Sequence, residues 1–233
     1  MIFLYSSTRD FYKYLKWSIA SLLDHTQVEK IILLAEDDEV ALDLPVPCPV
    51  EVINYSGQKY FDESCPNLQT QWKIIPLLYI LIPALVLEKK VIYLDMDTIV
   101  MEDLRPLWEI DLTGRWGAWC PELSGSYRMN GKPYYYNGGV AVMNLAQMRA
   151  DRYTEKLVKL LNSQYFPYSG QDALNWIMPT DKVFNLNVRY NESFCCGYTT
   201  NPAIIHYAGY PDWMDNQRMP RAEYLEEYKR QLS

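Results

Sequence analysis

Short apolar runs alternate with longer amphipathic segments along the first part of the chain. Residues 2–5 form an apolar run with a Ser-Ser-Thr ending, and residues 10–24 carry apolar side chains at helical spacing. Two further apolar runs follow at 30–35 and 50–55, the second after a proline-rich loop. Strands that alternate with helices are typical of an α/β fold, so we predict three layers, α/β/α, around a mainly parallel central sheet.

The same pattern continues to the end of the chain. An apolar segment at 68–87 is interpreted as a buried helix that its prolines interrupt or end, and the run at 91–94 as a fully buried central strand. After a loop-rich stretch, the pattern predicts a strand at 139–144, helices at 151–162 and 171–178, a short strand at 203–206 and a polar helix at about 221–232. No repeat or linker stands out, so we predict one domain over residues 1–233.

Charge excludes two classes of partner. The chain carries a formal net charge of −7 and has no cluster of lysine and arginine. Nucleic acids and anionic membranes both require clustered positive charge, so we predict neither as a partner. A bound phosphate would have to be held locally, by a metal or by one or two cations. The mixed charges of the last helix favour a solvated surface and make it a candidate contact for a homodimer.

Three features predict a reduced, cytoplasmic protein. The five cysteines are odd in number and lack paired CxxC spacing, which disfavours a disulfide or zinc framework. The start of the chain lacks the basic head and the cleavage site of a secretory signal. The longest uncharged apolar stretch, 74–87, is too short to span a bilayer and contains two prolines.

Two acids follow the predicted central strand. Asp95 and Asp97 stand two residues apart just after the run 91–94. Ligands bind beyond the carboxyl ends of strands in open α/β sheets, and two carboxylates there can face one hard cation that bridges a diphosphate. Because the pattern is short, a role in capping the following turn is an equal alternative for this pair taken alone.

A histidine follows a second buried run. His206 ends the apolar segment 203–205 and precedes a flexible Tyr-Ala-Gly turn. A histidine in this setting is more often a hydrogen-bonded core residue than a ligand. Combined with two carboxylates, however, one imidazole nitrogen makes a site that suits manganese, with magnesium as the next choice.

Four segments together resemble one family of enzymes. They are Tyr93–Val100 (YLDMDTIV), Asn137–Leu145 (NGGVAVMNL), Gln171–Asn175 (QDALN) and His206–Gly209 (HYAG). In this order and spacing they resemble glycosyltransferase family 8, which includes glycogenin-like and lipopolysaccharide galactosyltransferase-like enzymes. The similarity extends from the opening strand to about Trp213.

The resemblance implies a GT-A fold, a UDP-sugar donor, manganese, and transfer of a hexose to a glycan or protein hydroxyl with retention of configuration. It implies a nucleotide-binding part at about 1–100 and a sugar and acceptor part at about 101–215. By motif match, Asp95, Asp97 and His206 are the metal ligands, and Gln171, Asp172 and Asn137 are catalytic residues beside the sugar. The further donor-binding positions that it implies are Tyr5, Ser6, Ser7, Thr8, Lys73, Met96, Gly138 and Gly209.

The chain departs from the family pattern at two positions. The family usually has an acid immediately before the Gln-Asp pair, where this chain has Gly170. After the metal histidine the family commonly supplies a lysine to the diphosphate, whereas Asp212 stands in this segment here. Because of these departures, the sequence does not predict the rate of sugar transfer or how tightly the diphosphate is bound.

Two other functions compete with transfer. A sugar-nucleotide-binding module that lost turnover would explain both departures. A haloacid dehalogenase-like phosphatase would use the first acid of Asp-Met-Asp-Thr as its nucleophile, but that family places the motif near the amino terminus, with a lysine and an acidic pair later. The sequence fixes neither the donor sugar nor the acceptor.

Overall fold

A seven-stranded sheet, in the order β3-β2-β1-β4-β7-β6-β8, forms the centre of the protein. The computed structural model describes residues 1–69, 74–123, 131–210 and 212–232. The strands of this sheet are β1 (Ile2–Ser7), β2 (Lys30–Ala35), β3 (Val50–Asn54), β4 (Val91–Leu94), β6 (Gly117–Pro121), β7 (Tyr136–Met143) and β8 (Val183–Asn185). Strands β1 to β4 are mutually parallel, and β7 runs antiparallel to both β4 and β6. The predicted α/β fold with a mainly parallel sheet is confirmed.

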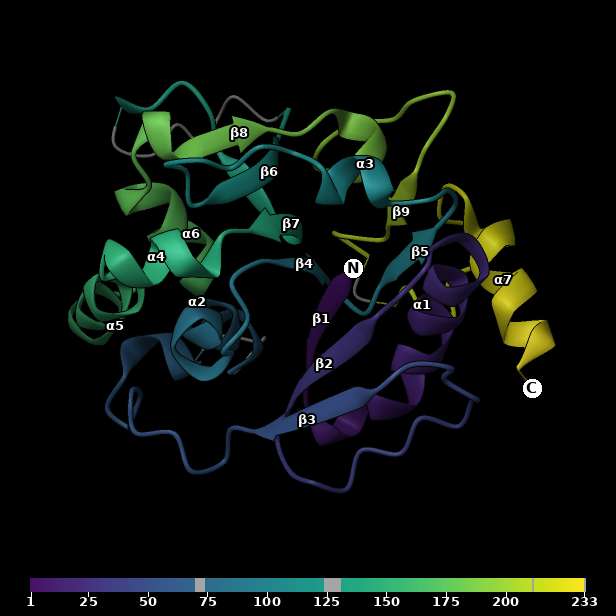
Figure 1. Cartoon of the computed structure of the whole chain (residues 1–233), viewed down its shortest axis with the longest axis horizontal. Helices are drawn as coiled ribbons and strands as arrows, with labels where there is room; N and C mark the ends of the chain where they lie inside the picture. The colour runs from purple at the N-terminus through teal and green to yellow at the C-terminus, as the bar shows by residue number, and fades with distance from the viewer. Residues whose placement is uncertain (70–73, 124–130, 211, 233) are drawn as a thin grey trace.

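Helices cover both faces of the sheet (Figure 1). One face packs against α2, α4, α5 and α6, and the other against α1 and the short α3. The helices are α1 (Tyr12–His25), α2 (Ile75–Leu85), α3 (Arg105–Trp108), α4 (Leu145–Ala150), α5 (Tyr153–Ser163), α6 (Ser169–Ile177) and α7 (Ala222–Gln231). Single 3-10 turns are η1 (Arg9–Phe11), η2 (Pro66–Gln69), η4 (Thr180–Lys182) and η5 (Val188–Tyr190).

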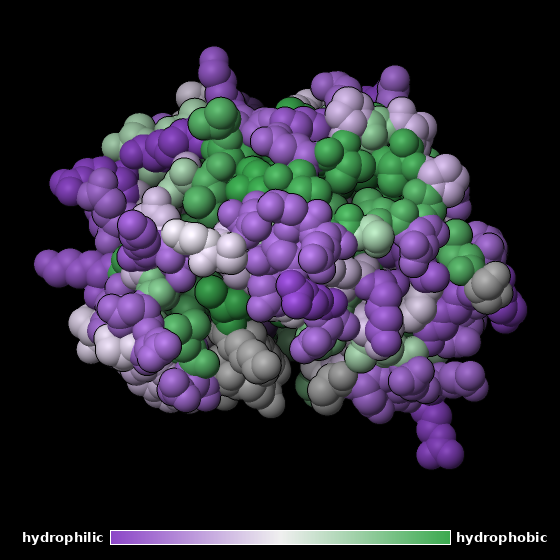
Figure 2. All heavy atoms as spheres, turned by 90° about the horizontal axis from the view of Figure 1, so that it is seen from below, coloured by the Kyte–Doolittle hydropathy of each residue, from purple (hydrophilic) through white to green (hydrophobic). Residues whose placement is uncertain are grey.

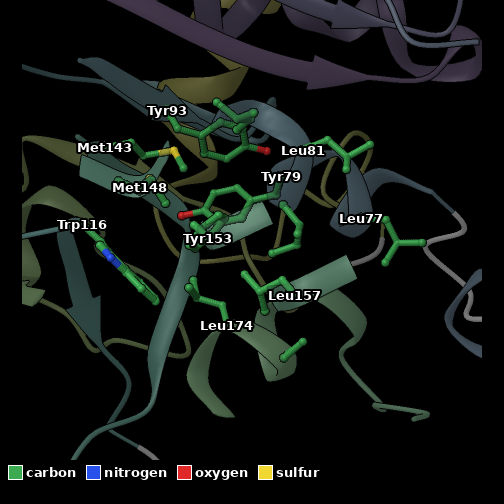
Figure 3. Packing of buried hydrophobic residues seen from close by; sticks show 14 of the residues in the cluster. Leu77, Tyr79, Leu81, Tyr93, Trp116, Met143, Met148, Tyr153, Leu157 and Leu174 are labelled. Carbon is green, nitrogen blue, oxygen red and sulfur yellow. The ribbon is translucent and has the colours of Figure 1, made fainter. Parts of the chain in front are cut away.

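Residues of the central strands alternate between two hydrophobic cores. In β4, Val91 and Tyr93 face the core under α2, while Ile92 and Leu94 face the core under α1. The rings of Tyr79 in α2 and Tyr93 in β4 meet edge to face, with centroids 4.8 Å apart (Figure 3). Such pairs favour one geometry, so the helix fixes the ring of Tyr93 next to the end of β4.

The predicted helix over 68–87 is shorter in the structure. Its start lies in the turn η2, residues 70–73 lie outside the described residues, and α2 extends from Ile75 to Leu85. Pro83 is accommodated inside α2, near its end. Arg149 donates from Nη1 to the carbonyls of Pro83 and Val86, at 3.2 and 2.9 Å. A cation at a helix carboxyl end satisfies carbonyls that have no partner within the helix.

The sequence pattern does not reveal strand β6, which lies in the loop-rich stretch before the predicted strand at 139–144. Gly117 is the first residue of β6, paired with Met143 of β7. A Cβ at this position would overlap the carbonyl oxygen of Val142 and lie 2.8 Å from the ring of Trp119. The glycine is therefore required by close packing inside the sheet and does not mark a turn.

A second, two-stranded sheet pairs β5 (Thr98–Val100) with β9 (Ile204–His206) in antiparallel register. Helix α7 lies beside this pair and beside α1, and Leu225 and Tyr228 are buried there. The predicted solvated helix is therefore solvated on one face only, because its apolar face completes a third core. The polar face stays exposed, and the homodimer remains a prediction.

The surface mixes polar and apolar side chains. Seen from below, apolar side chains form a band across a largely polar face (Figure 2). Among the described residues, no helix has the length and apolar character needed to cross a bilayer. All five cysteines are free thiols.

Candidate metal and sugar site

The acidic pair lies in the turn between β4 and β5. Strand β4 ends at Leu94, and the N–H of Asp95 then donates to the carbonyl of Gly139 in β7, at 2.8 Å. The hydroxyl of Thr98 closes the turn by donating to the carbonyl of Asp95, also at 2.8 Å. These bonds hold Asp95 and Asp97 at the carboxyl end of β4, where the sequence placed them.

Pairing of β5 with β9 brings His206 to the acids. Thr98 lies opposite His206, and the N–H of Tyr207 donates to the carbonyl of Asp97 at 2.9 Å. Nε2 of His206 lies 3.2 Å from Oδ1 of Asp97 and 3.7 Å from Oδ2 of Asp95. One ligand atom from each of the three residues falls within a span of 4.8 Å, which is compact enough for a single cation.

Room at this cluster depends on Gly139. A Cβ there would overlap Cε1 of His206 and lie 2.6 Å from its Nε2 and 2.8 Å from Oδ2 of Asp95. The missing side chain therefore leaves the space that the three ligand atoms face. Two carboxylates and one imidazole nitrogen around such a space fit a divalent cation, and the hard-oxygen majority suits manganese or magnesium.

The three groups perturb one another. Burial and the charge of Asp97 raise the pKa of Asp95 to about 6. Burial alone would lower the pKa of His206, but the charges of Asp97 and Asp95 outweigh it and raise this pKa to about 9. Two carboxylates and an imidazole that perturb one another this strongly form a setting in which a divalent cation can bind.

A chain of side-chain amides leads away from His206. Nδ1 of His206 lies 2.7 Å from Oδ1 of Asn191, whose Nδ2 donates to Oδ1 of Asn137 at 3.0 Å. The N–H of Gly139 also donates to Oδ1 of Asn137, at 3.0 Å, so this atom must be the oxygen. Nδ2 of Asn137 then donates to Oε1 of Glu122 at 3.0 Å. Each amide then has one orientation, and Oδ1 of Asn191 accepts from Nδ1–H of His206, which directs Nε2 toward Asp95 and Asp97.

Gln171 and Asp172 come from the start of α6. The N–H of Gly138 donates to Oε1 of Gln171 at 2.8 Å, which turns the amide nitrogen toward Tyr135 and Glu122, at 3.1 and 3.3 Å. Asp172 is 1% exposed, and its two oxygens accept from the hydroxyl of Tyr135 and from the backbone of Tyr168, at 2.6 and 2.8 Å. Asp172 therefore holds Tyr135 in contact with Gln171.

The residues predicted to hold uridine lie at the end of β1. Tyr5 is buried and its hydroxyl lies 3.2 Å from Oγ of Ser18. Ser6 lies on the other face, with Oγ 2.8 Å from the hydroxyl of Tyr93, which donates to Oδ1 of Asp95 at 2.6 Å. Ser7 is buried, whereas Thr8 is partly exposed. Ser6 thus contacts the candidate metal site through Tyr93, and Thr8 starts the accessible part of the loop.

The other predicted donor-binding residues have different settings. Met96 lies in the turn between the two acids and packs against two of the cores. Gly209 follows His206 with φ of +87°, a left-handed conformation that favours glycine. Lys73 lies outside the described residues.

Three residues of the site were missed by sequence reasoning: Tyr93, Glu122 and Asn191. Tyr93 belongs to the segment YLDMDTIV, but its place in a buried apolar run predicts only a core residue. Asn191 follows η5 in a segment that pairs with β9, where the N–H of His206 donates to the carbonyl of Glu192 at 2.8 Å. No spacing in the sequence relates Asn191 to His206 or Glu122 to Gln171, because these contacts arise only in the folded sheet.

We expect Asn191→Ala to weaken manganese binding about 10- to 100-fold, because an outer hydrogen bond fixes the ring and tautomer of a ligating histidine. Asn191→Asp keeps an oxygen for Nδ1–H and should lose less. Calorimetric titration of each variant with manganese measures both affinities. Unchanged affinity in Asn191→Ala would show that His206 needs no such support.

A comparison with models of known protein families tests whether the four segments belong to one family. The sequence model of glycosyl transferase family 8 matches residues 3–216, which is nearly the whole chain. The chain belongs to glycosyl transferase family 8. This confirms the resemblance, and it leaves the phosphatase alternative without support because the Asp-Met-Asp segment lies within the match to this family.

Similar proteins of known sequence match part of the chain. General stress protein A of Bacillus subtilis is 28% identical over 174 residues, 62% of this chain and 59% of the relative. Lipopolysaccharide glucosyltransferase WaaO of Escherichia coli is 26% identical over 152 residues, 53% of this chain and 44% of WaaO. The chain thus spans less than two thirds of the length of these relatives.

Solved structures agree over nearly the full length. The galactosyltransferase LgtC, in complex with donor and acceptor sugar analogs, superposes with a TM-score of 0.78 over 100% of this chain and 96% of LgtC, at 21% identity. An active-site mutant of LgtC gives a TM-score of 0.81 at 19% identity, over 99% and 96%. These likenesses confirm the GT-A fold of this family 8 protein.

Proposed function

We propose that this family 8 protein is a metal-dependent glycosyltransferase that moves a hexose from a UDP-sugar to a hydroxyl of a glycan or protein, with retention of configuration. The observation that carries the proposal is the convergence of Asp95, Asp97 and His206 at the carboxyl end of β4. Family membership supports transfer of a sugar as the reaction class.

The residues that would hold the cation are Asp95, Asp97 and His206, through the carboxylates and Nε2. A cation bound there supplies Lewis acidity to the leaving diphosphate, on which negative charge develops as the sugar–phosphate bond breaks. Tyr93 orients Asp95 by donating to its Oδ1, and Asn191 keeps the proton of His206 on Nδ1. Manganese is proposed first because of the mixed oxygen and nitrogen ligands.

On the sugar side, the protein offers fixed polar groups. Asn137 and Gln171 are each held by at least three hydrogen bonds, so they need little reorganisation when positive charge develops on the sugar. Asp172 acts through Tyr135 and positions Gln171. Since Oε1 of Gln171 is committed to the N–H of Gly138, we favour front-face attack by the acceptor hydroxyl over attack by this side chain.

A binding module that has lost turnover is the second candidate, and Gly170 and Asp212, which depart from the family pattern, favour it. Arg9 and Lys132 could replace the family's phosphate-binding lysine, but Arg9 pairs with Asp37 at 2.5 Å. Lys132 donates to the carbonyls of Asn175 and Trp176 at the end of α6, each at 2.6 Å. In the described part of the chain, Arg9 and Lys132 therefore both bind protein groups.

Release of UDP distinguishes the two candidates. The purified protein is incubated with a panel of UDP-sugars with manganese, and again after chelation of the metal. We expect manganese-dependent release from one donor, increased by a suitable hydroxyl acceptor. Calorimetric binding of UDP with no turnover of any donor, even with glycan and protein acceptors present, would favour the binding module.

A further inference from the structure

Helix packing leaves no space for a side chain at residue 170, where family 8 usually has an acid immediately before the Gln-Asp pair. Gly170 lies in the first turn of α6, against the start of α2. A Cβ at residue 170 would overlap the carbonyl oxygen of Pro76 and lie 2.9 Å from its carbonyl carbon and 3.1 Å from Cγ1 of Ile80. Two of these atoms are backbone and cannot rotate away. The position therefore accepts no side chain, and an acid there would force the helices apart.

A carboxylate from the end of β6 lies beside Gln171. Glu122 follows the end of β6, and its N–H donates to the carbonyl of Tyr135 at 2.8 Å. Its Oε1 accepts from Nδ2 of Asn137 at 3.0 Å and from Nε2 of Gln171 at 3.3 Å. Glu122 thus contacts the residue that immediately follows Gly170, and it ends the chain of amides that begins at His206.

We propose that Glu122 supplies a carboxylate that faces the donor sugar beside Asn137 and Gln171. The inference rests on the proposed transfer reaction and adds a residue to it. The role is electrostatic: the anion stabilises positive character that develops on the sugar as the bond to the diphosphate breaks. No covalent bond to Glu122 is involved.

The surroundings suit an anion that is partly withdrawn from water. Burial raises the pKa of Glu122, while the hydrogen bonds from Asn137 and Gln171 act in the opposite direction. Both donors are amide N–H groups, which stabilise the ionised carboxylate of Glu122. An amide N–H cannot accept a hydrogen bond from a protonated carboxyl. Within the described residues, both bonds end on Oε1, so neither of these amides occupies Oε2.

A purely structural role is the competing explanation, in which Glu122 only anchors Asn137 and Gln171. Glu122→Gln separates the two roles, because a glutamine oxygen can accept the same two hydrogen bonds and only the charge is lost. Glu122→Asp keeps the charge on a shorter side chain. A matched control is Glu155→Gln on α5, whose exposed carboxylate pairs only with Arg152 among the described contacts.

The experiment measures manganese-dependent UDP release with the active donor, and calorimetric binding of UDP, UDP-glucose and UDP-galactose. For Glu122→Gln we expect kcat to fall about 100-fold, the loss typical of one removed electrostatic group, while the affinity for UDP stays within about twofold. The affinity for the donor whose sugar it contacts should fall about tenfold. Glu122→Asp should recover part of kcat, and Glu155→Gln should match the wild type.

If the wild type is active, two outcomes would overturn the inference. Wild-type kcat in Glu122→Gln would show that the charge has no role and that the hydrogen bonds suffice. Equal losses of UDP and donor affinity would show a general disturbance of the site. If the wild type releases UDP from no donor, the proposed function fails, and the binding arm still decides: a variant that binds both UDP-sugars as tightly as the wild type refutes the contact.

Discussion

Replacing Asp95 or Asp97 by asparagine is expected to abolish manganese binding and to reduce UDP release by about 1,000-fold or more. Each substitution removes one of two charged ligands from a cluster with a single imidazole nitrogen. The cation's stabilisation of the leaving diphosphate is then lost with it. Calorimetric titration with manganese and the rate of UDP release measure the two effects separately.

The matched control for these variants is Asp103→Asn. Asp103 is exposed and accepts from the N–H of Arg105 at 3.0 Å, a bond that asparagine can also accept. Its activity should equal that of the wild type. If Asp95→Asn and Asp97→Asn both bound manganese with unchanged affinity, the cation would lie elsewhere and the assignment of all three ligands would be wrong.

Gly139→Ala should remove metal binding without removing a ligand. The added Cβ would occupy the space between His206 and Asp95, and the backbone cannot retreat freely because the carbonyl of Gly139 accepts from the N–H of Asp95. We expect manganese affinity to fall at least about 100-fold and UDP release to fall with it. Manganese titration measures the first effect, and circular dichroism checks that the fold persists.

Gly138→Ala provides the comparison for this result. A Cβ at residue 138 would meet only Oε1 of Gln171, at 3.4 Å, which is an ordinary contact. Gly138→Ala should keep manganese affinity within about twofold of the wild type, although residue 138 is directly next to residue 139. Equal manganese affinity in the two alanine variants would show that space at Gly139 does not limit the metal site.

The helices and strands could be predicted because burial sets the pattern of apolar residues along the sequence. Strands β1, β2 and β4 are continuous apolar runs, as buried parallel strands are, and α1 shows helical spacing. The errors occurred where tertiary packing overrides the local signal. Gly117 lies in a loop-rich stretch of the sequence, although it is buried in β6. The last helix is rich in charged residues, and it also buries an apolar face.

The candidate site divides in the same way. The positions of Asp95 and Asp97 followed from their place after a buried run, and His206 from a similar run that pairs with β5. Asn191 and Glu122 could not be found, because their partners are 15 and 49 residues away and meet only across folded strands. Steric exclusion at Gly170 also depends on a neighbouring helix, which no local pattern describes.

The oriented chain of amides connects the proposed metal site with the proposed sugar site. Asn191 and Asn137 each have one orientation, so the chain is polarised from the imidazole of His206 to the carboxylate of Glu122. A cation at one end and a sugar at the other, where we propose them, would act on the same polarised groups. Reciprocity then requires that any factor by which the cation tightens the hold on the sugar is the factor by which the sugar tightens the hold on the cation.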